Sequence, residues 1–115
     1  MTRVDYWQDD ATKTYYLSVV GHAGYASAGN DIVCAGVSAV SYALLGFLLN
    51  AEEDLTELSQ ETEDGRVVVL AQGNDRICTA FEMALIGYLQ IEKQYPTHVE
   101  VHIADKRSAD SWERP

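Results

Sequence analysis

The sequence predicts an α+β fold, a ββαββαβ sandwich in which two helices pack on one mixed or antiparallel sheet. Short segments rich in β-branched and aromatic residues, separated by turn residues, predict the strands. Two longer segments with apolar residues at helical spacing predict the helices. A chain of 115 residues has about the usual size of one domain, so residues 1–115 are expected to form one domain, with a frayed polar tail over residues 104–115.

The chain is expected to open with a β-hairpin. Residues 4–7 begin a strand pattern, residues 8–11 form a polar turn, and residues 15–20 are aromatic and β-branched. Residues 21–29 are mostly Gly, Ala and Ser and offer few packing anchors, which predicts a loop that can move.

The first helix is expected to begin after Asp31, because Asp is a preferred N-cap residue. Its apolar positions surround much of the helix and place it deep in the core. They are Ile32, Val33, Val37, Val40, Leu44, Leu45 and Leu48. Acidic residues 52–54 end this helix.

A second hairpin and a second helix follow. Residues 55–61 alternate apolar and polar side chains, Asp64-Gly65 is a turn signal, and residues 66–71 supply the partner strand. Residues 73–75 open the second helix, with Asp75 as its expected cap, and Tyr95-Pro96 ends it. The apolar positions of this helix are Ile77, Phe81, Ala84, Leu85, Tyr88 and Leu89. The alternating residues Val99, Val101 and Ile103 predict the last strand.

Composition narrows the classes of function. The net charge of −10, with few scattered Lys and Arg residues, argues against direct nucleic-acid binding and weakly favours basic partners. The charged first residues lack a signal-peptide core, and no later apolar run is expected to reach the roughly 18 residues of a membrane span. The cytosol is the expected location. Cys34 and Cys78 are expected to be free thiols, since neither CxxC spacing nor a secretory context is present.

His22 and Cys34 form the candidate catalytic pair. At position N3 of the first helix, the Cys34 thiolate would be stabilised by the helix dipole, and an imidazole is a suitable general base and acid near neutral pH. The helix-start amides, that of Cys34 included, are candidate oxyanion donors. The alternatives are a small buried hydrophobe for Cys34 and a strand-end histidine facing water for His22.

A near-repeat in the sequence helps to choose between the two thiols. Residues 30–34 (NDIVC) and 74–78 (NDRIC) each place a cysteine three residues after an Asp at a helix start, so the local helix chemistry of both is expected to be similar. Only Cys34 follows a histidine and a small-residue loop, which makes it the better candidate for a nucleophile. The repeat could also arise by chance over so short a span.

Four further residues are candidates for supporting roles. Asp31 is first a helix cap and second a group that orients His22. Ser38 lies one turn after Cys34, where its hydroxyl could line the site or bond back to the Cys34 carbonyl. Gly24 and Gly29 could serve as hinges that let the loop close over a bound peptide, or simply belong to a flexible surface loop.

A metal site is the weaker alternative. His98 and His102 lie four residues apart on an expected strand, roughly 13 Å from each other, which is too far to share one ion. Both are expected to face solvent, and neither a metal nor another cofactor is expected.

These motifs resemble the ribosomal-processing cysteine protease Prp family. The matching segments are residues 21–26 (GHAGYA), Gly29 and residues 31–38 (DIVCAGVS), and the chain length, element order and residues 94–96 (QYP) are also similar. His22 and Cys34 match the family's catalytic pair, and the segment between them matches its mobile substrate-closing loop. Gly36 departs from the pattern, since the family often has alanine there.

The resemblance implies a small cytoplasmic homodimeric endopeptidase. Its substrate would be a basic large-subunit ribosomal protein that carries an N-terminal leader, cleaved through a thioester at Cys34. The open alternatives are a non-catalytic ribosome-associated binding or assembly factor and a small metal-binding regulator.

Overall fold

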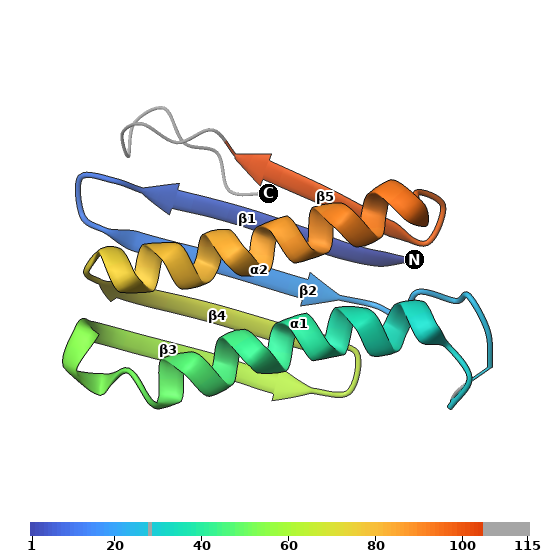
Figure 1. Cartoon of the computed structure of the whole chain (residues 1–115), viewed down its shortest axis with the longest axis horizontal. Coiled ribbons are helices and arrows are strands. Elements are labelled where there is room, and N and C mark those ends of the chain that lie inside the picture. Colours follow the sequence, from blue (N-terminus) through green and yellow to red (C-terminus); the bar gives the residue numbers. More distant parts are fainter. Residues whose placement is uncertain (28, 105–115) are drawn as a thin grey trace.

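The computed structural model of the chain describes residues 1–27 and 29–104. In these residues two helices lie side by side on one face of a five-stranded sheet (Figure 1). The elements, in order, are β1 (Thr2–Asp9), β2 (Thr14–Val20), α1 (Ile32–Leu49), the 3-10 turn η1 (Glu52–Asp54), β3 (Leu55–Glu63), β4 (Arg66–Gly73), α2 (Asp75–Gln94) and β5 (Val99–Ala104). The ββαββαβ order expected from the sequence is confirmed.

The sheet is mixed, with strand order β3-β4-β2-β1-β5. Every neighbouring pair is antiparallel except β1 and β5, which run parallel. This topology brings the end of β2, the start of α1, the β3–β4 turn and the start of β5 to the same end of the molecule (Figure 1). The starts of the two helices lie at opposite ends.

The core lies between the helices and the inner face of the sheet. Alternate residues of the central strands, such as Val4, Leu17 and Val69, are at most 1% exposed and meet the apolar stripes of both helices. The helices approach closely where Gly87 of α2 faces Val40 of α1: a Cβ on Gly87 would lie 3.1 Å from a Val40 methyl group. Because glycine permits this contact, α1 and α2 form one tightly packed layer.

Helix α1 corrects the expectation that no apolar segment reaches the length of a membrane span. Its 18 residues carry no charge and have a mean hydropathy of 2.2, so by length and composition the helix could cross a bilayer. Alanine, glycine and serine separate the larger apolar residues, so the sequence did not show one continuous apolar segment of this length. The residues Val33, Val37, Leu44 and Leu48 are at most 5% exposed and pack into the core.

Two expected boundaries are also corrected. The N-cap of α2 is Asn74, whose side chain accepts a hydrogen bond from the Arg76 amide, and Asp75 is the first helical residue. Ala104 is the last residue of β5 and not the start of the tail, because this strand pairs along β1 as far as Trp7. The rest of the expected tail, residues 105–115, lies outside the described residues.

A buried hydrogen bond joins the helices at Ser41 and Tyr88. Ser41 donates to the Val37 carbonyl, so the Tyr88 hydroxyl donates its own proton to Ser41 Oγ at 2.7 Å. Burial raises the pKa of Tyr88 to about 12, and the phenol keeps this proton at neutral pH.

Ser41→Ala is expected to lower the free energy of unfolding by about 1–3 kcal/mol, because it leaves the Tyr88 hydroxyl buried without its acceptor. Chemical denaturation monitored by circular dichroism measures the change. Adding Tyr88→Phe should recover part of the loss, since both polar partners are then gone. A Ser41→Ala protein as stable as wild type would contradict the importance of this bond.

Candidate active site

A groove of about 700 Å³ lies at the end of the molecule where α1 begins. Its walls come from the loop after β2, the first turns of α1 and the β3–β4 turn. The residues that line it include His22, Gly24, Gly29, Asp31, Cys34, Ser38, Ser41, Tyr42, Glu63, Asp64, Gly65 and Arg66. Every residue that the sequence singled out for a catalytic, supporting or hinge role thus lines one groove.

The start of α1 places Cys34 at this groove. Asp31 is the N-cap, with extended backbone angles, and its Oδ1 accepts a hydrogen bond of 2.9 Å from the Cys34 amide. Cys34 therefore occupies N3, as expected, and is half-buried. The bond also corrects one expectation: the Cys34 amide already has an acceptor and is not free to receive an oxyanion.

Asp31 also holds the loop. Its Oδ2 accepts hydrogen bonds from the Tyr25 amide at 3.0 Å and from the Ala26 amide at 3.5 Å. Donation from the Cys34 amide, with these loop amides, holds the pKa of Asp31 below its usual range. Among the described residues no hydrogen bond joins Asp31 to His22, so its observed partners are backbone amides.

His22 lies on another wall of the groove, over the β3–β4 turn. The Gly21 amide donates to the Gly65 carbonyl at 2.8 Å, and Nε2 of His22 lies 4.0 Å from Asp64 Oδ2. The ring packs on Gly65 so closely that a Cβ at Gly65 would lie 2.9 Å from Nε2. In the described part of the chain no hydrogen bond joins His22 to Cys34.

The two hinge candidates and Ser38 are open to the groove. Gly24 and Gly29 have φ values of 69° and 87°, a conformation that favours glycine, and a Cβ at either would meet nothing within 4 Å. Ser38 is half-buried and makes no side-chain hydrogen bond to another described residue, so the back-bond to the Cys34 carbonyl is absent. Its hydroxyl is available to a bound molecule.

The loop has more anchors than the sequence indicated. Ala23 is 2% exposed and belongs to the core. The Tyr25 ring packs edge-on against Tyr95 and His98, with ring centroids 5.3 and 5.4 Å away. These contacts join the loop to the connection between α2 and β5, which lies far away in the sequence.

The two C-terminal histidines have separate partners. His98 precedes β5, is half-buried, and its Nδ1 lies 3.0 Å from the Ala23 carbonyl oxygen; the expectation that it faces solvent from a strand was wrong. His102 lies in β5 and pairs with Glu100 two residues away. No group of three or more potential metal ligands occurs among residues 1–27 and 29–104.

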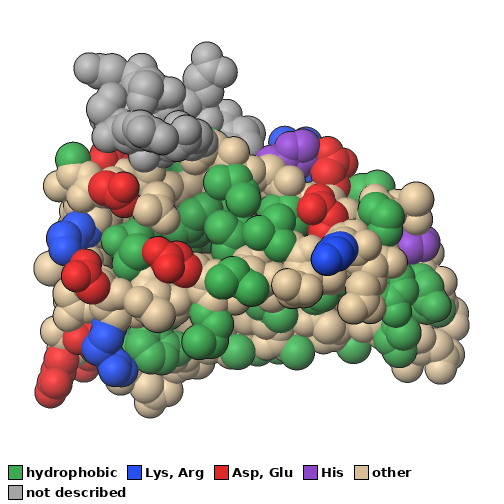
Figure 2. Space-filling view, turned by 45° about the horizontal axis from the view of Figure 1, so that its top comes forward, with side chains coloured by type: hydrophobic (Ala, Val, Ile, Leu, Met, Phe, Trp, Pro, Cys, Tyr) green, Lys and Arg blue, Asp and Glu red, His purple; other side chains and the backbone are tan. Residues whose placement is uncertain are grey.

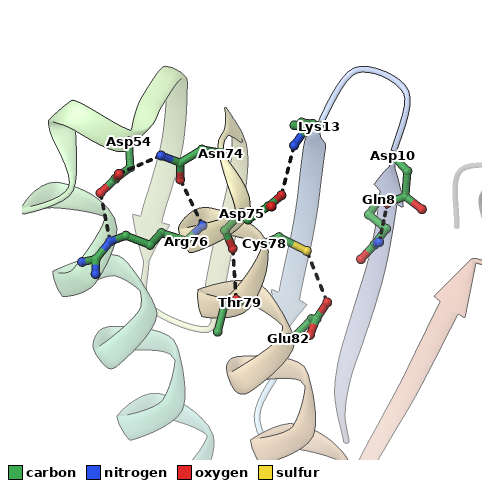
Figure 3. A network of polar contacts seen from close by, with 10 residues as sticks. All are labelled: Gln8, Asp10, Lys13, Asp54, Asn74, Asp75, Arg76, Cys78, Thr79 and Glu82. Carbon is green, nitrogen blue, oxygen red and sulfur yellow. Dashed lines mark hydrogen bonds and ion pairs between the residues drawn. The ribbon is translucent and has the colours of Figure 1, made fainter.

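Cys78 lies in a different environment at the opposite end of the helical layer. Its thiol donates to Glu82 Oε1 at 3.2 Å (Figure 3). Burial raises the pKa of the Cys78 thiol, and the Glu82 carboxylate raises it further, against a lowering by Tyr15. The expectation that both thiols share the same helix chemistry was wrong, because Cys78 lies one residue deeper in its helix and faces a carboxylate.

Polar side chains at the start of α2 also pair with neighbouring elements. Arg76 pairs with Asp54 at 3.1 Å, Asn74 donates to the same carboxylate at 2.7 Å, and Lys13 pairs with Asp75 (Figure 3). This network connects α2 to η1 and to the β1–β2 turn. These contacts hold the three elements together at this end of the molecule.

A thiol at a helix start and a histidine across an open groove are the components of a cysteine protease. The family model described as "Cysteine protease Prp" matches residues 1–100, and the chain belongs to this family. The ribosomal processing cysteine protease Prp of Staphylococcus aureus strain Mu50 is 24% identical over 104 residues, which cover 89% of this chain and 98% of the relative.

Solved structures share the fold. Staphylococcus aureus Prp, in complex with a covalently linked product peptide, superimposes with a TM-score of 0.79 and 24% identity, over 90% of this chain and 99% of the other. The same protease with a substrate peptide gives a TM-score of 0.70 and 22% identity over the same shares. SMU.848 from Streptococcus mutans gives 0.67 and 25%, over 90% and 93%.

Sequence reasoning missed Asp64, Gly65 and His98 as neighbours of the candidate histidine and its loop. Asp64-Gly65 carried a turn signal, but nothing in the sequence shows that this turn lies beneath His22. His98 is a residue type that can donate or accept hydrogen bonds, but no motif around it indicates contact with the loop after His22. Long-range strand pairing brings Asp64 and Gly65 to the groove, and the connection before β5 brings His98 against the loop at Ala23 and Tyr25.

Gly65→Ala is expected to displace the His22 ring and to lower the unfolding temperature, because the new Cβ meets the ring at a positive φ. Two-dimensional NMR of the histidine ring signals and thermal unfolding measure both effects. Gly29→Ala is the matched control, since its φ is also positive but its surroundings are open. Unchanged His22 signals in Gly65→Ala would contradict the contact.

Proposed function

We propose that this protein is an endopeptidase in which Cys34 is the nucleophile and His22 the general base and acid. Its substrate is a large-subunit ribosomal protein, from which it removes an N-terminal extension. The observation that carries the proposal is that Cys34 and His22 line one groove, whereas Cys78 lies at the other end of the helical layer. The names of the relatives, ribosomal processing proteases, support the choice of substrate.

The reaction proceeds in two halves. His22 takes the thiol proton, the Cys34 sulfur bonds to the scissile carbonyl carbon, and the tetrahedral intermediate collapses as the C–N bond breaks. His22 gives its proton to the departing amine and leaves a thioester. Water, deprotonated by His22, then hydrolyses the thioester and the thiol regains its proton.

The His22 ring must turn toward Cys34 and the loop segment after Ala23 must close, since no hydrogen bond joins the two side chains among the described residues. Catalytic contacts often tighten only when substrate binds. Gly24 and Gly29 are the hinges, and the exposed segment that contains Gly29 closes over the peptide.

The start of α1 supports the chemistry in two ways. The positive end of the helix dipole stabilises the Cys34 thiolate, although the Asp31 carboxylate partly opposes this effect. The Ser38 hydroxyl, one turn further along α1, lines the groove, has no partner among the described residues and is the side-chain donor for the oxyanion. The Cys34 amide contributes only if Asp31 releases it.

Charge around the groove favours a basic substrate. Among the described residues, Asp31, Glu63 and Asp64 line the groove together with one lysine or arginine, Arg66. Arg66 itself pairs with Glu61 at 3.0 Å and Glu63 at 3.7 Å, which leaves the rim acidic. A ribosomal substrate also implies a cytoplasmic location, as expected from the sequence.

The outward face of the helical layer is the surface on which two copies pair as a homodimer. Tyr42 and Leu49 of α1 and Met83 and Ile86 of α2 are 57–71% exposed. Figure 2 shows hydrophobic side chains near the middle of the molecular surface, with charged side chains around them. A large exposed apolar area of this kind is typical of a protein interface.

Cleavage of a leader-bearing ribosomal protein tests the proposed mechanism. Cys34→Ala and His22→Ala are expected to lose at least about 1,000-fold in kcat/KM, as nucleophile and base removal does in other acyl-transfer enzymes. Cys78→Ala, the matched thiol control, should cleave at the wild-type rate. Mass spectrometry of the products over time gives the rates and the cleaved bond.

An intact substrate after incubation with wild type would refute the proposed activity and favour a role limited to binding. Activity that survives Cys34→Ala but is lost in Cys78→Ala would show that Cys78, and not Cys34, is the nucleophile.

Met83→Glu is expected to shift the protein from dimer to monomer, because it buries a charge in the proposed interface. Sedimentation velocity at micromolar concentrations measures the change. Leu70→Glu is the control: Leu70 lies in β4 between the core residues Val69 and Ala71, so its side chain faces the other side of the sheet. A wild-type protein that sediments as a monomer, or a dimeric Met83→Glu, would rule out this interface.

A further inference from the structure

A second histidine holds the backbone next to the candidate catalytic one. Nδ1 of His98 lies 3.0 Å from the carbonyl oxygen of Ala23, the residue that follows His22. A carbonyl oxygen only accepts hydrogen bonds, so Nδ1 carries the proton and donates it. We propose that His98 is a positioning residue that fixes the backbone carrying His22; this inference rests on the proposed catalytic role of His22.

His98 is itself firmly held. Its amide donates to the Tyr95 carbonyl at 2.9 Å, and its carbonyl accepts from the Thr2 amide at 3.0 Å. Thr2 begins β1, an inner strand of the sheet, and Val99, which follows His98, is fully buried. The His98 ring therefore extends from a fixed point of the sheet and not from a free loop.

The backbone is held by one hydrogen bond on each side of His22 along the chain. Before His22, the Gly21 amide donates to Gly65; after it, the Ala23 carbonyl accepts from His98. The two anchors come from different parts of the chain, the β3–β4 turn and the connection before β5. With both in place, the backbone on either side of His22 has a defined orientation.

The surroundings of the contact make it costly to lose. Ala23 is 2% exposed. A buried carbonyl that loses its hydrogen-bond donor lowers the stability of the folded protein. The Tyr25 ring packs edge-on against the His98 ring at an interplanar angle of 82°, which limits rotation of the imidazole. His98 thus connects the groove loop to the sheet through one polar and one aromatic contact.

Two amide substitutions separate positioning from packing. The side-chain amide of Asn can occupy the place of Nδ1, whereas that of Gln reaches the place of Nε2. His98→Asn is therefore expected to keep kcat within about 3-fold of wild type, and His98→Gln to lower it by about 10- to 100-fold with little change in KM. His102→Ala, which removes the histidine paired with Glu100, is the control and should behave as wild type.

An NMR measurement tests the contact without activity. The carbonyl ¹³C signal of Ala23 is expected to move upfield in His98→Gln and to stay near its wild-type position in His98→Asn and His102→Ala. Thermal unfolding of each variant shows whether it is folded at the assay temperature.

The outcomes distinguish the two proposals. If His22→Ala retains activity, the proposed catalytic role fails and the inference about His98 fails with it. If His22→Ala is inactive but folded His98→Gln has wild-type kcat, only the positioning role of His98 is overturned. A kcat that falls equally in His98→Asn and His98→Gln would also overturn it, since the hydrogen bond would not be the cause.

Discussion

The carboxylate of Asp31 is the interaction on which the groove depends. One oxygen caps α1 through the Cys34 amide, and the other holds the loop through the Tyr25 amide. The Asp31 side chain thus fixes both the start of the helix that carries Cys34 and the end of the loop that follows His22. Backbone donors stabilise its ionised form, as the lowered pKa reflects. A helix cap, usually a local device, here connects the two halves of the site.

This arrangement has an electrostatic consequence for the thiol. The N3 position offers Cys34 the positive end of a helix, but the capping carboxylate lies within one turn and takes up its amide. Helix polarity is therefore partly offset at Cys34, which is why the proposed mechanism assigns activation of the thiol to His22. The contacts around His22 lie outside the helix, on the β3–β4 turn and the connection before β5. The site is in this sense distributed over the fold, with the helix start as only one of its parts.

The sequence predicted what depends on local patterns. Element order, the Asp31 cap and the N3 position of Cys34 follow from periodicity and capping preference, which act within a few residues. The cap of α2 was misplaced by one residue because Asn74 and Asp75 are both good caps. The seat of His22 on Gly65 and the bond from His98 to Ala23 were not predictable, since they join segments separated by more than 40 residues. The uncharged length of α1 was underestimated because small residues separate its larger apolar side chains.

The near-repeat around the two cysteines shows why local similarity is not enough to define a site. Both segments begin a helix with Asn-Asp and place a cysteine three residues after the Asp, yet the antiparallel helices carry these starts to opposite ends of the molecule. At the start of α2, ion pairs connect the helix to η1 and the β1–β2 turn, and Glu82 accepts a hydrogen bond from the Cys78 thiol. At the start of α1, the loop after β2, the first turns of the helix and the β3–β4 turn together surround a groove. The difference between the two thiols therefore comes from the elements that the topology brings to each end, and not from the helices themselves.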